Sequence, residues 1–329
     1  MLPFKRLCLA FALAVLPLLP MSATALSVMD PFNLEQAMDA GAVKMGDGVA
    51  YADGPRKKLD VYVPKNPEGP APVVFFIYGG GWKNGDRADY AFVGQALASR
   101  GFVTVIADYR LVPEVKYPEF LEDNAQALRW VQDNIATYGG DTARLFIAGH
   151  SAGAYGAVML GLDRSFFREY GITMPVRGIA ALSGPYDFYP FEYDEVRVAF
   201  GEAPNPEGTQ PVNLVTPESP PMYLASGTTD PIVRVENTVT LAQKLKAQNV
   251  WVTERYYEGF GHMEPVFAIG SLWRWRAPVL EDMVEFFYRF GAFPSGVPYA
   301  AVTPNPPEEN FQPMSDIIAE MDKMLAPVD

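Results

Sequence analysis

Residues 144–153 have the sequence RLFIAGHSAG, which carries the clearest structural signal in the chain. The last five of these residues form a G-x-S-x-G pentapeptide, which is only suggestive by itself. An apolar run precedes the pentapeptide, and a helix-like run of small and apolar residues, 152–162, follows it. A strand, a tight glycine turn and a helix form a nucleophile elbow, which exposes the central serine at the end of a sheet. The segment therefore predicts that Ser151 is a nucleophile, and an ordinary strand-to-helix turn is the alternative.

The rest of the chain alternates between strand-like and helical patterns. Short apolar runs predict strands at residues 58–63, 72–78, 102–107, 144–148, 176–182, 221–225 and 250–257. Apolar residues at three- and four-residue spacing predict helices at residues 120–138, 235–248 and 278–290. Such alternation is typical of a mostly parallel central sheet flanked by helices, so the predicted fold class is α/β.

Two of the strand patterns also predict what surrounds each strand. Residues 58–63 alternate between polar and apolar side chains, which predicts a strand with one face exposed to solvent. Residues 72–78, PVVFFIY, are continuously apolar, which is typical of a strand that is buried on both faces. A single α/β domain across residues 26–329 fits the length of the chain.

Two segments do not fit the alternation of strands and helices. Residues 186–220 are rich in proline, aromatic and acidic residues and exceed an ordinary connection, which predicts a small cap-like insert. Residues 294–329 form a C-terminal extension that is first rich in proline and then carries a short amphipathic pattern at 314–325. We expect this tail to pack on the domain, and an arm that binds a partner is the alternative.

The first 25 residues have the pattern of a secretory signal peptide. Lys5 and Arg6 are followed by the apolar residues 7–20 and by small residues at 23–25 that suit cleavage. The pattern predicts removal of residues 1–25 and a periplasmic or secreted protein. After this segment no apolar run reaches about 18 residues, so we expect no membrane span in the cleaved chain.

The composition argues against several classes of protein. The chain has 329 residues, 49% of them hydrophobic, with 39 acidic and 26 basic residues and a net charge of −13. Such a charge repels phosphate backbones, so we expect no nucleic-acid partner. Cys8 is the single cysteine and lies in the signal segment, so the sequence predicts no intramolecular disulfide and no metal site built from cysteines.

The chain contains two histidines, which limits the choice of a general base for Ser151. A serine hydroxyl needs an adjacent base. His150 is held inside the elbow, where its side chain is expected to leave in a different direction from that of Ser151. His262, in the loop after the last predicted strand, is therefore the predicted base. Asp230 is the predicted carboxylate that orients the histidine, because it preserves the chain order Ser, Asp, His. Asp187, after the strand that follows the elbow, remains a rival acid, and Glu258 or another acid is a further alternative.

Attack on a carbonyl group creates a negatively charged oxygen, which needs hydrogen-bond donors. A run of three glycines supplies candidate donors. Residues 79–81 directly follow the apolar run 72–78, and glycine lets the backbone N–H groups approach a ligand closely. Together with the N–H of Ala152, these groups are expected to form an oxyanion hole. A phosphate-binding loop is excluded, because the run has neither a G-K-[ST] sequence after it nor G-x-G-x-x-G spacing.

These motifs together resemble the α/β-hydrolase superfamily, and within it the esterase/lipase group similar to hormone-sensitive lipase. The resemblance covers roughly residues 59–290 and rests on YGGGW at 78–82, DYRLVPE at 108–114, YP at 117–118, YGGD at 138–141, GHSAG at 149–153, TTDP at 228–231 and GFGH at 259–262. It implies an α/β-hydrolase fold and hydrolysis of carboxylic esters through an acyl-serine, with no metal and no organic cofactor. It also implies that Gly80 and Gly81 donate to the oxyanion. The group usually has histidine where this chain has Tyr78, which affects loop placement and substrate range.

The expected substrate is a small-molecule ester with a small acyl group. Trp82, Tyr109 and Phe260 are candidates to line an acyl or aryl pocket, and ordinary core packing is the alternative for each. An amidase such as an aryl formamidase has the same fold and triad, so amide hydrolysis stays open. A binding protein on an inactive hydrolase scaffold is the alternative from a different class. The sequence does not indicate an oligomeric state.

Overall fold

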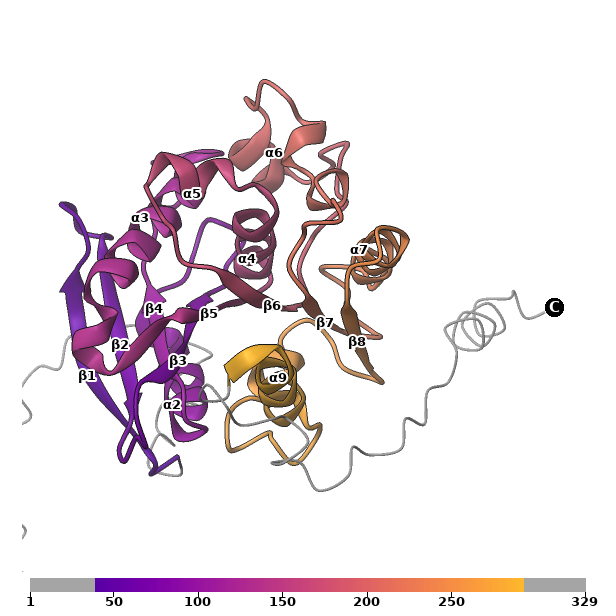
Figure 1. Cartoon of the computed structure of the whole chain (residues 1–329). Helices are drawn as coiled ribbons and strands as arrows, with labels where there is room; N and C mark the ends of the chain where they lie inside the picture. Colours follow the sequence, from indigo (N-terminus) through magenta and orange to yellow (C-terminus); the bar gives the residue numbers. More distant parts are fainter. Residues whose placement is uncertain (1–38, 293–329) are drawn as a thin grey trace, which may run out of the picture.

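The computed structural model describes residues 39–292, which form one twisted sheet with helices on both faces (Figure 1). Within these residues the sheet has eight strands in the order β1-β2-β4-β3-β5-β6-β7-β8. The strands are β1 Ala42–Ala50, β2 Lys58–Pro64, β3 Ala71–Ile77, β4 Val103–Ala107, β5 Gly140–His150, β6 Val176–Leu182, β7 Met222–Gly227 and β8 Val252–Tyr257. β2 pairs antiparallel with both β1 and β4, and the strands from β4 to β8 pair in parallel. The mostly parallel α/β sheet predicted from the sequence is therefore confirmed.

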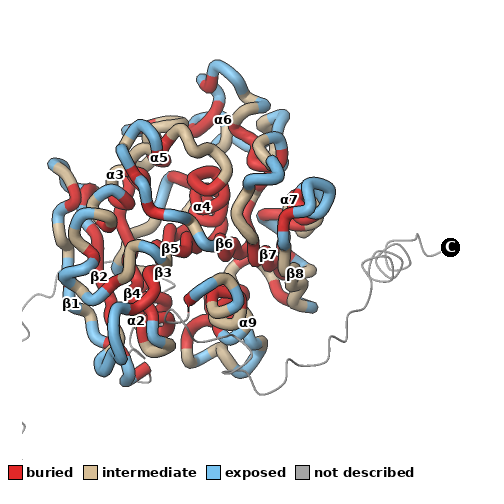
Figure 2. Tube along the Cα trace, in the orientation of Figure 1, coloured by how far each residue is buried: buried red, intermediate tan, exposed pale blue. Residues whose placement is uncertain are grey.

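Helices cover the sheet in two layers (Figure 1). The described helices are α2 Ala91–Ser99, α3 Glu119–Asn134, α4 Ala152–Leu162, α5 Ser165–Glu169, α6 Asp194–Phe200, α7 Glu236–Ala247, α8 Glu264–Phe267 and α9 Val279–Phe287. α3, α4 and α7 lie on one face, and α2 and α9 lie on the other (Figure 1). Buried residues follow the central strands, α4 on one face and α2 and α9 on the other, so the core lies on both faces of the sheet (Figure 2). None of the helices in the described part of the chain is long and apolar enough to cross a membrane.

The interpretation of β2 as a strand with one exposed face is wrong. Residues 59–63 are all buried, although polar and apolar side chains alternate along them. Asp60 accepts a hydrogen bond from Arg87 Nε at 2.9 Å and lies 2.8 Å from Lys44 Nζ, so its charge is paired inside the protein. A polar residue in a strand indicates solvent only when no partner from another element neutralises it.

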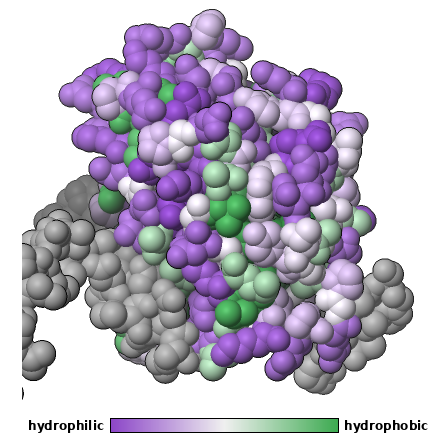
Figure 3. Space-filling model, turned by 90° about the vertical axis from the view of Figure 1, so that its left-hand side faces the viewer, coloured by the Kyte–Doolittle hydropathy of each residue, from purple (hydrophilic) through white to green (hydrophobic). Residues whose placement is uncertain are grey.

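The sequence patterns missed β1 and α2. β1 is an edge strand with only two buried residues, Ala42 and Gly46, and irregular register, so it lacks strict alternation. α2 is buried along most of its length, so it lacks the polar face that a periodicity search detects. The β1 side of the molecule is mostly hydrophilic with a narrow hydrophobic band (Figure 3), and Val43 and Met45 are exposed on the strand itself. Bulges and charged side chains such as Lys44 discourage such an edge from pairing with another strand.

The parallel strands end at one edge of the sheet, and this edge receives the predicted functional residues. β5 ends at His150 directly before Ser151, and the loops after β7 and β8 carry Asp230 and His262. The glycine run follows β3, which pairs in parallel with β5. In open α/β sheets this carboxyl edge is where ligands bind. The signal segment 1–25, with Cys8, and the tail 294–329 lie outside the described residues.

Candidate active site

Ser151 occupies a strained turn between β5 and α4. Its φ is 55° and its ψ is −125°, a conformation that a residue with a side chain rarely adopts. A bond to the neighbouring strand β6 holds the turn, since Ser151 N–H donates to Leu182 O at 2.9 Å. Gly153 is required two residues later, because a Cβ there would lie 2.0 Å from the carbonyl oxygen of Ile77. The predicted elbow is thus present, with the serine next to a cavity.

Ser151, His262 and Asp230 form a continuous hydrogen-bonded chain. His262 Nε2 lies 2.8 Å from Ser151 Oγ, and His262 Nδ1 lies 2.7 Å from Asp230 Oδ2. A carboxylate only accepts hydrogen bonds, so Nδ1 carries the proton and Nε2 is free to accept one from the serine. All three side chains are largely buried. The geometry allows Ser151 to lose its proton to His262 as it attacks an electrophile.

Asp230 is held in place by more than the histidine. Its Oδ1 accepts hydrogen bonds from the N–H groups of Ile232 and Val233, both at 2.9 Å. Burial by itself would raise the pKa of Asp230, but the bonds from His262 and from these two amides outweigh it and lower the pKa below its usual value. The carboxyl group is therefore an anion at neutral pH, as a partner of a protonated imidazole needs to be.

The rival acid, Asp187, lies elsewhere in the site. It is exposed, its N–H donates to Asn237 Oδ1 at 2.9 Å, and it lines the cavity beside Ser151. His262 has its Nδ1 bonded to Asp230, so the structure brings together the Ser–His–Asp set that the sequence favoured.

Two of the three predicted oxyanion donors border the cavity. Gly81 and Ala152 line it together with Ser151, whereas Gly80 is not among its lining residues. Ala152 is the first residue of α4, where backbone N–H groups have no partner within the helix and the helix dipole favours negative charge. Gly80 has a φ of 136°, and its carbonyl accepts from the N–H of Asn84 at 2.9 Å, which turns the loop sharply.

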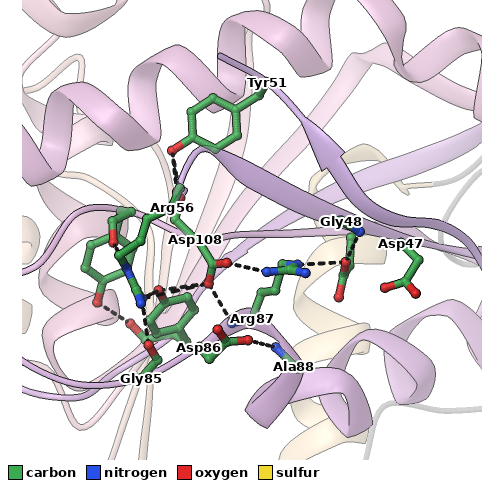
Figure 4. Close-up of polar contacts among 12 residues, drawn as sticks. Asp47, Gly48, Tyr51, Arg56, Gly85, Asp86, Arg87, Ala88 and Asp108 are labelled. Carbon is green, nitrogen blue, oxygen red and sulfur yellow. Dashed lines mark hydrogen bonds and ion pairs between the residues drawn. The ribbon is translucent and has the colours of Figure 1, made fainter. Parts of the chain in front are cut away.

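A buried polar cluster supports the start of the glycine run (Figure 4). The ring of Tyr78 stacks on Tyr109 with centroids 4.7 Å apart, and its hydroxyl donates to Asp108 Oδ1 at 3.2 Å. Asp108 also accepts from the backbone N–H of Arg87 at 2.8 Å and forms an ion pair with the guanidinium of Arg87. Burial raises the pKa of Tyr78, so its hydroxyl remains a donor. The sequence patterns did not indicate this cluster, because its members come from separate loops.

The cavity beside Ser151 has a volume of about 510 Å³ and mixes apolar and polar lining. Trp82 lines the cavity, and its backbone is left-handed, with a φ of 59°. Its ring packs edge-on against Tyr155 and Phe200. The rest of the lining comes from the segment after β6, which includes the insert, from the loop after β7 and from the start of α7, namely Pro185, Asp187, Phe188, Tyr189, Pro190, Glu192, Tyr193, Glu195, Val196, Pro231, Ile232, Val233, Arg234 and Asn237. The segment predicted as a cap-like insert, residues 186–220, therefore borders the cavity beside Ser151.

The other two predicted pocket aromatics do not line this cavity. Tyr109 is buried beneath the glycine run, where its hydroxyl donates to the carbonyl of Tyr78 at 2.9 Å. Phe260 is also buried, with its ring against Tyr257 and the guanidinium of Arg276 over it. Both positions correct the sequence-based expectation, because a ring near a catalytic motif in sequence is turned into the core here. Among the described residues, no group of three or more His, Cys, Asp or Glu side chains could hold a metal ion.

A protein-family model and several known proteins are similar to this chain. The family model described as BD-FAE matches residues 59–245, which is more than half of the chain. The chain belongs to the BD-FAE family. The residues that the model covers include the glycine run, Ser151 and Asp230, and His262 follows them.

Individual relatives of this BD-FAE chain include named esterases. The probable isoprenylcysteine alpha-carbonyl methylesterase ICME of Oryza sativa is 29% identical over 73% of this chain and 63% of its own length. Esterase LipC of Mycobacterium tuberculosis is 31% identical over 60% of this chain and 54% of its own length. The chain therefore spans less than two thirds of each of these relatives. The structure of esterase B from Lactobacillus rhamnosis has a TM-score of 0.68, with 19% identity over 79% of this chain and 91% of that one, which shows a shared fold.

Proposed function

We propose that the protein is a serine hydrolase that cleaves carboxylic esters with small acyl groups. The observation that carries the proposal is the hydrogen-bonded chain from Ser151 Oγ through both ring nitrogens of His262 to Asp230. Membership of the BD-FAE family and the esterase names of its relatives support the same reaction.

The reaction has two halves. Ser151 Oγ attacks the ester carbonyl carbon while its proton moves to His262 Nε2, and the carbonyl oxygen becomes an oxyanion near the N–H groups of Gly81 and Ala152. The proton then passes from His262 to the leaving alcohol, the C–O bond breaks and an acyl-serine remains. Water repeats the sequence with His262 as base and releases the carboxylic acid. Asp230 remains an anion and stabilises the imidazolium in both halves.

The size of the cavity supports a small substrate. A volume of about 510 Å³ has to hold both the acyl group and the alcohol, and side chains of the insert border it. Its apolar lining includes Trp82, Phe188 and Val196, which suit an alkyl or aryl group. Tyr189 lines the same cavity and is exposed to solvent.

The experiment that tests the proposal measures kcat/KM for p-nitrophenyl esters from acetate to dodecanoate, with Ser151→Ala as the control. We expect a short-chain optimum and turnover that is lost in the control. Each ester is paired with the corresponding p-nitroanilide, because faster amide turnover would replace the proposal with an amidase. No Ser151-dependent turnover of either series would point to a binding protein on a hydrolase scaffold.

We also propose that the protein is exported to the periplasm or secreted. The charged, apolar and small-residue pattern of the first 25 residues supports this location. Expression of the full chain, followed by cell fractionation and N-terminal sequencing, tests it. A product in the cytoplasm that still begins at Met1 would contradict the proposal.

A further inference from the structure

The residues that carry the oxyanion donors belong to a single short loop. We define the glycine loop as residues 78–85, which follow β3 and contain the three glycines. Its interior turn is closed by the Gly80 carbonyl, which accepts hydrogen bonds from the N–H groups of Lys83 and Asn84. Its two ends touch, because a Cβ on Gly85 would lie 2.7 Å from the carbonyl oxygen of Gly79. Contacts that hold these two ends together therefore help to fix the positions of the backbone N–H donors in the loop.

One guanidinium holds both ends. Arg56, in the turn between β1 and β2, donates from Nη2 to Tyr78 Oη and to the carbonyl of Gly85, both at 2.7 Å. Its Nε donates to the carbonyl of Tyr109 at 2.8 Å. Arg56 and Gly85 lie side by side in Figure 4, with Asp108 next to them. The side chain therefore bridges the first and last residues of the glycine loop and the loop that follows β4.

The contact between Arg56 and Tyr109 also supports the glycine loop. Tyr109, whose carbonyl accepts from Arg56, donates its own hydroxyl to the carbonyl of Tyr78 at 2.9 Å. The Tyr78 hydroxyl lies between Arg56 and Asp108, accepting from the first and donating to the second. Both oxygen atoms of Tyr78 are thus bonded to Arg56 or to a residue that lies beside it.

We propose that Arg56 is a positioning residue for the oxyanion donors, acting by tying together the ends of the glycine loop. This inference rests on the proposed serine hydrolase function. Arg56 does not line the cavity, so it acts on the reaction only through the loop. A planar guanidinium reaches two carbonyls and a hydroxyl at once, whereas the single ammonium of lysine does not reproduce this fork. Preorganised donors matter most when charge develops in the transition state, so the loss should fall on kcat.

The test compares Arg56→Met with a matched control, Arg144→Met. Arg144 also forms three bonds, to Asp141 and to the carbonyls of Pro70 and Ala292, but it lies near the amino end of β5, away from Ser151. For p-nitrophenyl acetate we expect Arg56→Met to lower kcat by about 10- to 100-fold, while KM changes by less than about 3-fold. Arg144→Met should keep kcat within about 2-fold of wild type, although it loses stability of the same kind.

A second readout is independent of the ester chosen. A fluorophosphonate probe labels an activated serine, and its labelling of Ser151 should slow in Arg56→Met by a factor similar to the loss in kcat. Millimolar guanidinium should restore part of the activity of Arg56→Ala and none of that of Ser151→Ala. A kcat and labelling rate for Arg56→Met equal to those of Arg144→Met would overturn the proposal.

The proposal can still be tested if Arg56→Met does not fold or if the wild type hydrolyses no ester. If Arg56→Met does not fold, Tyr78→Phe is measured instead, because it removes one acceptor of the guanidinium and leaves the ring in place. The kcat of Tyr78→Phe should fall by about 3- to 10-fold, and an unchanged kcat would overturn the proposal.

If the wild type hydrolyses no ester in a Ser151-dependent way, the proposed ester hydrolase function fails. The labelling rates of the two arginine variants still decide the role of Arg56 in that case.

Discussion

The side chain of His150 bonds to the backbone of His262, the residue proposed as the base. His150 Nε2 lies 3.0 Å from the carbonyl oxygen of His262, and the two ring centroids are 5.0 Å apart. A carbonyl only accepts, so Nε2 carries the proton and Nδ1 is left to accept from the Tyr90 hydroxyl at 3.4 Å. That hydroxyl accepts in turn from the N–H of Gly79 at 3.3 Å. The buried ring of His150, through the Tyr90 hydroxyl, thereby connects the loop that carries His262 to the glycine loop.

The first prediction concerns the catalytic effect of this bond. His150→Phe keeps a ring of similar size but has no donor for the carbonyl of His262, so we expect kcat to fall by about 10-fold. His150→Gln places an amide nitrogen near the former Nε2 and should retain most of kcat. The measurement is kcat and KM for p-nitrophenyl acetate, with thermal unfolding to show that both variants are folded. Equal rates for His150→Phe and wild type would show that the bond has no influence on the base.

The second prediction is the pH profile of the reaction. Burial, together with the charge of nearby His262, lowers the pKa of His150 to about 3, so this ring stays neutral between pH 5 and 8. The lowered pKa of Asp230 keeps its carboxylate ionised over the same range. Neither group then changes its charge between pH 5 and 8, so neither obscures the requirement that His262 accept the serine proton. We expect kcat/KM to rise with pH through a single ionisation, because the imidazolium cannot accept the serine proton. A flat profile, or one with two ionisations, would contradict this assignment.

The third prediction is that His150 makes the fold sensitive to acid. A histidine in the unfolded chain has a pKa near 6.5, above the folded value of about 3, so the unfolded state binds the extra proton between these values. This contribution to stability is complete above about pH 6.5 and is lost as the pH falls below it, by at most about 1.4 kcal/mol per pH unit. Denaturant unfolding of wild type and His150→Gln from pH 7 to pH 5 measures the difference. We expect the free energy of unfolding to fall less steeply in the variant; parallel slopes would show that His150 is not the group responsible.

Features built from one continuous stretch of the chain were predictable, and features that join distant stretches were not. The elbow around Ser151 was predictable because strand, turn and helix follow one another directly, and the scarcity of histidines then identified His262. The misread strand β2 depends on Asp60, whose partners Lys44 and Arg87 come from other elements. Residue type and spacing carry no information about such distant pairs.

The pocket was less predictable than the triad for a related reason. Tyr109 and Phe260 lie close to catalytic motifs in the sequence, but the direction of a side chain after a strand end depends on the tertiary packing of its loop. Arg56 escaped detection altogether, since it lies in a hairpin turn outside every motif and meets the glycine loop only in the folded protein. Chemistry that depends on local turns is visible in this sequence, and support from distant loops is not.

The fourth prediction separates the two candidate acids. Asp230→Asn removes the negative charge and lets an amide face His262 Nδ1, which favours the wrong tautomer, so we expect kcat to fall by about 10⁴-fold. Asp187→Asn changes an exposed residue of the cavity and should alter KM more than kcat, by less than about 10-fold. Both rates are measured with p-nitrophenyl acetate. A more severe loss in Asp187→Asn would assign the acid to that residue.

The last prediction uses two neighbouring glycines that both keep their N–H group when replaced by alanine. At Gly80 a Cβ would lie 2.1 Å from the carbonyl oxygen of Asn84, on a backbone with a φ of 136°. At Gly81 the φ is 61° and a Cβ would meet no atom within 4 Å. The left-handed conformation at Gly81 costs alanine about 1 kcal/mol, whereas Gly80→Ala has to displace the backbone of the loop.

We therefore expect Gly80→Ala to lower kcat by at least about 100-fold, comparable to the loss of an oxyanion donor, and Gly81→Ala by less than about 10-fold. Fluorophosphonate labelling of Ser151 should follow the same order, since it depends on the same donors. Thermal unfolding of both variants separates a displaced loop from a general loss of folding. If Gly81→Ala were the more damaging substitution, the shape of the cavity at Gly81 would matter more than the position of the loop, and the glycine loop would not be the rigid element described above.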